Sequence, residues 1–97
     1  MNGYAKYVVC YDISDNRNRA KFFTELKNLG LIAVQYSVFL GELNSSELKW
    51  LTKLASQHVK SPDKCFWLQI PFDVNNFSKF PGYQEFKFIE HDGYDCI

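Results

Sequence analysis

The amino-acid sequence predicts an α+β fold in which two helices cover one antiparallel sheet. Four segments of strand length are rich in β-branched, aromatic and other apolar residues. Two further segments repeat apolar residues at the 3.6-residue spacing of a helix. The order along the chain is βαββαβ, and short connections with right-handed crossovers turn that order into a two-layer sandwich.

The first strand is expected at residues 4–13, a mostly buried run rich in Val and Tyr. Residues 14–16, Ser-Asp-Asn, are types that begin helices, and a helix is expected over residues 17–29. Gly30 stands where a glycine commonly ends a helix. Five apolar residues are expected to face inward from this helix: Ala20, Phe22, Phe23, Leu26 and Leu29.

The second half of the predicted domain begins with residues 31–43, which are too long and too rich in β-formers for one ordinary strand. Two short strands that separate near residues 35–37 are therefore expected. A second helix is expected to start near residues 44–46 and to end near Val59. A last strand follows over residues 65–72, with a proline near its end.

These elements predict a ferredoxin-like domain over residues 1–72 and a C-terminal extension over residues 73–97. A chain of 97 residues has a modest core, so a homodimer is expected. Within the extension, residues 84–89 alternate polar and apolar side chains. This segment is a candidate fifth strand for a dimer or partner contact.

The formal net charge of the chain is zero but is unevenly distributed. Residues 1–71 contain 9 Lys or Arg against 6 Asp or Glu, and residues 72–97 contain 2 against 5. A strong stand-alone nucleic-acid binder is usually more basic, so such binding is expected to depend on a local patch or a partner. Neither an apolar run of about 18 residues nor a signal-peptide pattern occurs, which predicts a cytoplasmic protein without a membrane partner.

Cysteine and histidine do not indicate a disulfide framework, a zinc site or a paired-histidine ribonuclease. Cys10, Cys65 and Cys96 are odd in number and lack CxxC spacing. Cys10 lies in an apolar run and is expected to be a buried thiol. Nothing in the spacing of His58 and His91 brings the two together.

Asp12, at the C-terminal end of the first predicted strand, is the main candidate for chemistry. A carboxylate there is costly unless it is paired or binds a metal ion, and Mg²⁺ or Mn²⁺ prefers oxygen ligands. The alternative is an aspartate that caps a helix or forms a turn. One carboxylate makes a poor metal site, but two copies with Asp12 near a shared two-fold axis would make a better one.

Arg17 and Arg19 lie in the first turn of the first predicted helix, where acidic residues are usual. Phosphate contact at the helix start is one interpretation, and solvated surface charge is the other. Ser37 has no evident histidine base, which argues against a serine nucleophile. Residues 35–42 lack the signature of an RNA-recognition motif.

Residues 11–43, YDISDNRNRAKFFTELKNLGLIAVQYSVFLGEL, resemble the CRISPR-associated Cas-two family, the small partner of the CRISPR spacer integrase. The family pattern places Tyr-Asp-Ile at the end of the first strand, followed by arginines, a helix, a glycine and Gln-x-Ser-Val-Phe-x-Gly. In this chain the pattern corresponds to residues 11–13, Arg17, Arg19, Gly30 and residues 35–41.

The resemblance implies a homodimer in which Asp12 of each subunit faces a Mg²⁺ or Mn²⁺ ion at the dimer centre. It implies metal-dependent cleavage of RNA or DNA phosphodiesters in some members, with Asp12 as the catalytic residue. Arg17 and Arg19 would then contact the nucleic-acid backbone. The residues implied to line the site are Tyr11, Ser37 and Phe39.

The second role that the resemblance implies is architectural and belongs to CRISPR adaptation. The dimer would bridge integrase subunits, bind DNA and help set the length of the captured spacer. Two alternatives are a toxin-type ribonuclease similar to virulence-associated protein D and a ferredoxin-like ligand-binding regulator. The Gln-x-Ser-Val-Phe motif favours the CRISPR-associated family over the toxin-type ribonuclease. The effector loop expected of a ligand-binding regulator is not found in the sequence.

Overall fold

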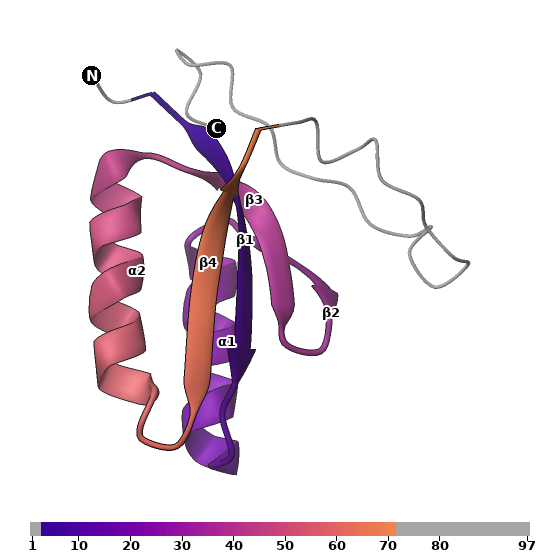
Figure 1. Cartoon of the computed structure of the whole chain (residues 1–97), viewed down its shortest axis with the longest axis vertical. Helices are drawn as coiled ribbons and strands as arrows, with labels where there is room; N and C mark the ends of the chain where they lie inside the picture. Colours follow the sequence, from indigo (N-terminus) through magenta and orange to yellow (C-terminus); the bar gives the residue numbers. More distant parts are fainter. Residues whose placement is uncertain (1–2, 72–97) are drawn as a thin grey trace.

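The computed structural model of the chain describes residues 3–71. Six elements follow in the predicted βαββαβ order within that range (Figure 1). They are β1 (Ala5–Asp12), α1 (Asn16–Asn28), β2 (Ile32–Gln35), β3 (Val38–Leu43), α2 (Ser45–His58) and β4 (Lys64–Ile70). The predicted elements are confirmed, whereas the candidate fifth strand and the rest of the extension lie outside the described residues.

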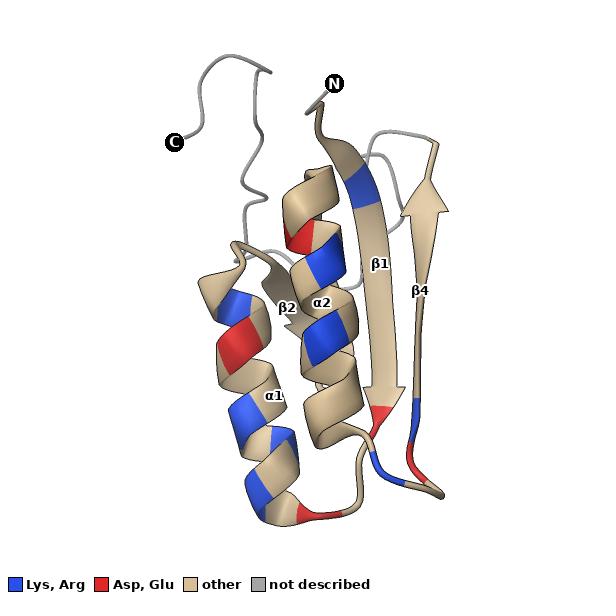
Figure 2. Cartoon of the chain, turned by 90° about the vertical axis from the view of Figure 1, so that its left-hand side faces the viewer, with Lys and Arg blue, Asp and Glu red and all other residues tan. Residues whose placement is uncertain are grey.

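The four strands form one antiparallel sheet in the order β2-β3-β1-β4. The two helices lie side by side on one face of this sheet, which is the predicted ferredoxin-like sandwich (Figures 1 and 2). No described helix covers the opposite face, which we call the open face. β1 lies between β3 and β4, so its C-terminal end is held from both sides.

The core lies between the sheet and the helices. Val9 and Tyr11 of β1 point into it, with exposed fractions of 0% and 7%. Because side chains alternate along a strand, Cys10 points to the open face instead. The expectation of a fully buried thiol is therefore corrected to a partly buried one, and this burial raises the pKa of Cys10.

Local signals explain where α1 begins and ends. The Asp15 side chain caps the helix by accepting a hydrogen bond from the Asn18 N–H at 2.8 Å. Gly30 has a φ of 92°, and its N–H donates to the Lys27 carbonyl at 2.9 Å. One detail of the predicted inward stripe is wrong: Ala20 is exposed, because it lies at the edge of that stripe.

α2 begins with a complete capping box between Asn44 and Glu47. The Asn44 side chain accepts from the Glu47 N–H at 2.8 Å, and the Glu47 side chain accepts from the Asn44 N–H at 2.9 Å. Leu51 and Leu54 are buried against the sheet, while Trp50 faces outward. Within residues 3–71, neither helix is long and apolar enough to cross a membrane.

Candidate functional site

Asp12 is the last residue of β1, and its side chain is exposed. Strand alternation places it on the open face, where Lys64 of β4 is its cross-strand neighbour. Asp15, not Asp12, caps α1, so the capping interpretation of Asp12 does not apply. Among the described residues, no hydrogen bond or ion pair engages the Asp12 carboxylate.

The donor chemistry around Asp12 fits a hard divalent cation only in part. No group of three or more His, Cys, Asp or Glu side chains within residues 3–71 is arranged to hold a metal ion. One chain therefore offers a single carboxylate. Mg²⁺ is commonly held by one or two carboxylates, with water and substrate phosphate as the other ligands. Asp12 fits this pattern when a second copy or a phosphate adds oxygen atoms.

The loop between β1 and α1 is fixed from two sides. The Asp63 carboxylate accepts hydrogen bonds from the Ser14 N–H at 3.1 Å and from the Ser14 hydroxyl at 2.9 Å. On the other side, the Arg19 guanidinium donates to the Ile13 carbonyl at 2.9 Å. These bonds connect the end of β1 to α1 and to the turn before β4, and they set the position of Asp12.

The contribution of Asp63 to stability is expected to depend on pH. Hydrogen bonds from the Ser14 and Lys60 amides lower the pKa of Asp63 from its usual 3.8. A carboxyl group with a lowered folded-state pKa stabilises the fold above its unfolded pKa, and this contribution is lost as the pH falls through the folded-state pKa. We expect Asp63→Asn to lower the unfolding midpoint at neutral pH and the difference from wild type to shrink below about pH 4.

Thermal unfolding followed by circular dichroism over a pH series measures this effect. Ser14→Ala is the matched control, because it removes one hydrogen bond and keeps the Asp63 charge. A difference between Asp63→Asn and wild type that stays constant from neutral to strongly acidic pH would contradict the prediction.

The structure gives the two predicted arginines different roles. Arg17 is exposed in the first turn of α1, which contains no acidic residue, and it has no ion pair or hydrogen bond among the described residues. Arg19 is half-buried, and its guanidinium also donates to the Ser14 carbonyl at 3.4 Å and to the Asn16 side chain. Arg17 is thus available to a phosphate, whereas Arg19 is part of the loop structure.

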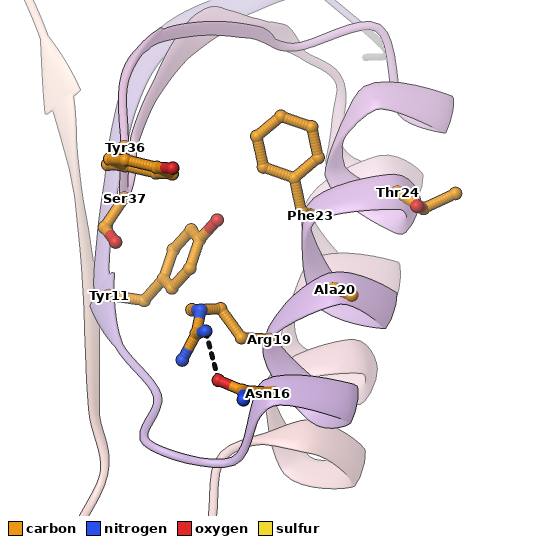
Figure 3. A pocket seen from close by; sticks show the side chains of 8 residues that line it. All are labelled: Tyr11, Asn16, Arg19, Ala20, Phe23, Thr24, Tyr36 and Ser37. Atoms are coloured by element: carbon orange, nitrogen blue, oxygen red, sulfur yellow. Dashed lines mark hydrogen bonds between the residues drawn. The ribbon is translucent and has the colours of Figure 1, made fainter.

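A pocket of about 360 Å³ lies between α1 and the β2–β3 turn (Figure 3). Of the residues predicted to belong to the site, Tyr11, Arg19 and Ser37 line this pocket. The other side chains that line it are Asn16, Ala20, Phe23, Thr24 and Tyr36. Sequence reasoning did not select Phe23 and Tyr36, although an aromatic residue in a two-residue turn was an available signal.

Phe39, also predicted to line the site, is fully buried instead. Its ring stacks on Tyr11 with 6.2 Å between centroids and packs edge-on against Phe23 at 5.1 Å. It therefore supports the pocket from the core side. The Tyr11 ring is also packed edge-on against Phe22 at 5.0 Å, which fixes its orientation.

The Tyr11 hydroxyl is neutral at physiological pH. Burial raises the pKa of Tyr11 above its usual value, although the positive charge of Arg19 acts in the opposite direction. A neutral phenol both donates and accepts hydrogen bonds.

The predicted site residues are divided between the two faces of the sheet. Asp12 is on the open face, while Tyr11, one residue earlier, points toward the helices. The pocket and the Asp12 carboxylate are therefore at the same end of β1 but on opposite sides of it.

Other titratable side chains in the described part are not arranged for catalysis. The Nδ1 atom of His58 is buried without a hydrogen-bond partner among residues 3–71, and its ring lies 6.1 Å from that of Phe22. Burial, with a smaller effect from Cys10, raises the pKa of Cys65 to about 11, so its thiol is protonated at neutral pH. His91 and Cys96 lie outside the described residues.

The fold is that of a small α+β protein of the ferredoxin-like class. The family model described as CRISPR associated protein Cas2 matches residues 5–79, which is more than half of the chain. This chain belongs to the Cas2 family. The family resemblance predicted from residues 11–43 is thus confirmed.

Similar proteins agree with this assignment. The chain is 32% identical over 92 residues, 95% of each protein, to "CRISPR-associated endoribonuclease Cas2 1" of Francisella tularensis subsp. novicida. It is 47% identical over 60 residues, 62% of this chain and 64% of the relative, to "CRISPR-associated endoribonuclease Cas2" of Korarchaeum cryptofilum.

Two solved structures have the same fold. The hypothetical protein TT1823 from Thermus thermophilus matches with a TM-score of 0.70 and 29% identity, over 79% of this chain and 94% of that one. A crystal structure of cas2 matches with a TM-score of 0.67 and 24% identity, over 90% and 99% of the two chains. At that identity the second likeness concerns the fold alone.

Proposed function

We propose that this chain is a CRISPR adaptation protein that acts as a homodimer, binds DNA, bridges integrase subunits and cleaves RNA or DNA phosphodiesters with a divalent metal ion. Relatives named as endoribonucleases support the nuclease part. The observation that carries it is the exposed Asp12 carboxylate, which has no partner among the described residues. Its decisive test compares metal-dependent cleavage by wild type and by Asp12→Ala.

An apolar patch on the open face supports a homodimer. Phe66 and Leu68 of β4 are 54% and 59% exposed, beside Cys10 and Val8 of β1. We call these four residues the open-face patch. Exposed apolar patches commonly mark interfaces, and a second copy with the same patch is a self-complementary partner. Since Asp12 ends a strand of this patch, a two-fold axis near that end would bring two Asp12 carboxylates together.

The residues at the end of β1 suit phosphodiester hydrolysis. A bound Mg²⁺ or Mn²⁺ ion would activate water and neutralise charge on the phosphate. Asp12 would hold the ion, and Arg17, at the N-terminus of α1, would contact a neighbouring phosphate. Arg19 and Asp63 keep the loop after Asp12 in place through Ile13 and Ser14.

The helix layer supports binding to a polyanion. Lys and Arg residues are spread along both helices (Figure 2). Exposed examples are Arg17 and Lys21 on α1 and Lys49 and Lys53 on α2. Such a surface suits the sequence-independent phosphate contacts that a DNA-binding scaffold needs.

Arg17→Ala is expected to weaken DNA binding without weakening the fold. Loss of one phosphate contact should lower affinity about equally for all sequences and reduce the slope of log affinity against log salt by about 1. Fluorescence anisotropy with labelled duplex DNA over a salt series measures this slope. Lys27→Ala, at the other end of α1, is the control and should change the salt slope less than Arg17→Ala does. An unchanged slope in Arg17→Ala would remove Arg17 from the interface.

We place the contact with the integrase in residues 73–97. This segment contains 2 Lys against 5 Asp or Glu, so its charge suits a basic integrase surface. It lies outside the described residues, and only its charge and position support the proposal. Capture of purified integrase by the full chain but not by a chain that ends at residue 72 is the expected result. Equal capture by both would contradict it.

A further inference from the structure

We propose that the pocket between α1 and the β2–β3 turn binds one unstacked nucleobase of a single-stranded RNA or DNA segment. This inference rests on the proposed function. It identifies one base as the part of the substrate that binds on the helix side of β1, near the C-terminal end of that strand. Three features carry it: an aromatic lining with one ring in solvent, a hydroxyl directed into the pocket, and a guanidinium held at its edge.

The aromatic lining comes from three separate elements. Tyr36, in the β2–β3 turn, is 93% exposed, so its ring contributes little to the core. Figure 3 shows Tyr36 across the pocket from Phe23 of α1, with the ring of Tyr11 below them. Unstacked bases are commonly bound by stacking on such rings, whatever their identity. A pocket of about 360 Å³ lies in the size range of small-ligand sites.

The Tyr11 hydroxyl gives the pocket a polar contact. Its side chain is 7% exposed and its hydroxyl points into the pocket (Figure 3), yet it has no hydrogen-bond partner within residues 3–71. Because the hydroxyl has no partner among the described residues, it is available to a ligand that enters the pocket. The edges of nucleobases carry both donors and acceptors, and either can pair with a phenol.

Arg19 supplies a fixed planar cation at the edge of the pocket. Two carbonyls, of Ile13 and Ser14, and the side chain of Asn16 accept hydrogen bonds from its terminal nitrogens. A guanidinium has five N–H donors, so donors remain for a ligand. Arg19 is the sole cation among the described lining residues, and three of the other seven lining residues are aromatic. That combination suits a flat heteroaromatic base better than a free phosphate.

The position of the pocket implies a preference for single strands. A base inside a duplex cannot reach such a pocket, because both its faces are stacked and its edge is paired. Tyr11 and Asp12 are adjacent in β1, so the backbone beside a captured base would pass the strand end that carries Asp12. Arg17, exposed in the first turn of α1 and without a partner among the described residues, is available to a phosphate of that strand.

The test uses Tyr36→Ala with Tyr36→Phe as the matched control. The probe is a short single strand, RNA in one arm and DNA in the other, that carries one 2-aminopurine whose fluorescence is quenched by stacking. We expect quenching with wild type and Tyr36→Phe, and loss of quenching with about tenfold weaker binding for Tyr36→Ala. Because Tyr36 is 93% exposed, the unfolding midpoints of all three proteins should agree. The arm with the tighter binding shows whether the pocket prefers a base from RNA or from DNA.

Equal quenching and affinity for wild type and Tyr36→Ala would overturn the proposal. It would also be overturned if wild type quenched the 2-aminopurine equally when the probe strand is paired in a duplex. Asp12→Ala separates this proposal from the nuclease, because it should leave quenching unchanged. Quenching that depends on Tyr36 without any cleavage would support the pocket and reject the nuclease. Cleavage that depends on Asp12, with no effect of Tyr36 on quenching, would reject the pocket alone.

Discussion

Asp12→Ala is expected to abolish metal-dependent cleavage of RNA or DNA. The Asp12 carboxylate is exposed at the end of β1 and has no partner among the described residues, so its removal leaves no buried group unsatisfied. Metal-ion catalysis of hydrolysis is commonly worth several kcal/mol, so we expect a loss on the order of 100-fold or more. The measurement is cleavage of labelled RNA and duplex DNA with Mg²⁺ or Mn²⁺ by both proteins side by side.

Two controls make this comparison specific. Chelation of the metal should stop cleavage by wild type, and added Mg²⁺ or Mn²⁺ should restore it. Asp15→Ala removes a nearby carboxylate that caps α1, so it should cost about 1 kcal/mol of stability while cleavage continues. Absent cleavage, or equal cleavage by wild type and Asp12→Ala, would contradict the nuclease proposal and leave the architectural role as the better account.

Leu68→Glu is expected to convert a dimer into a monomer. Leu68 is 59% exposed in the single chain, so glutamate is tolerated there by the isolated fold. In a dimer that buries the open-face patch, the same side chain would place an unpaired charge in an apolar interface. We expect dimer affinity to fall by about 100-fold or more. Sedimentation velocity over a concentration series measures it.

Trp50→Glu is the matched control for Leu68→Glu. Trp50 is 44% exposed but lies on α2, on the opposite layer of the sandwich, and should leave the dimer intact. If the metal site needs Asp12 from two chains, Leu68→Glu should also reduce cleavage although Asp12 is unchanged. A monomeric wild type, or a dimeric Leu68→Glu protein, would show that the open-face patch is not the dimer interface.

Much of the fold follows from short-range patterns. Asp15 and Gly30 mark the two ends of α1 because a capping side chain and a residue that tolerates positive φ act within a few residues. Asn44 and Glu47 do the same for the start of α2. The family resemblance was likewise carried by one continuous segment, residues 11–43.

The site followed from the sequence less completely, because exposure and partners depend on distant residues. Arg17 and Arg19 have the same local setting in the sequence, but only Arg19 reaches the loop after β1. Phe39 belongs to the same motif as Ser37, yet the packing of Tyr11 and Phe23 buries it in the core.

The order of elements, their approximate ends and the family could be predicted from the sequence, because periodicity, caps and motifs are local properties of the chain. Which face of β1 the helices cover, that Asp63 reaches across to Ser14, and that Tyr36 stands opposite Phe23 all required the tertiary structure. These arrangements depend on strand pairing and helix packing, which bring together residues far apart in the chain.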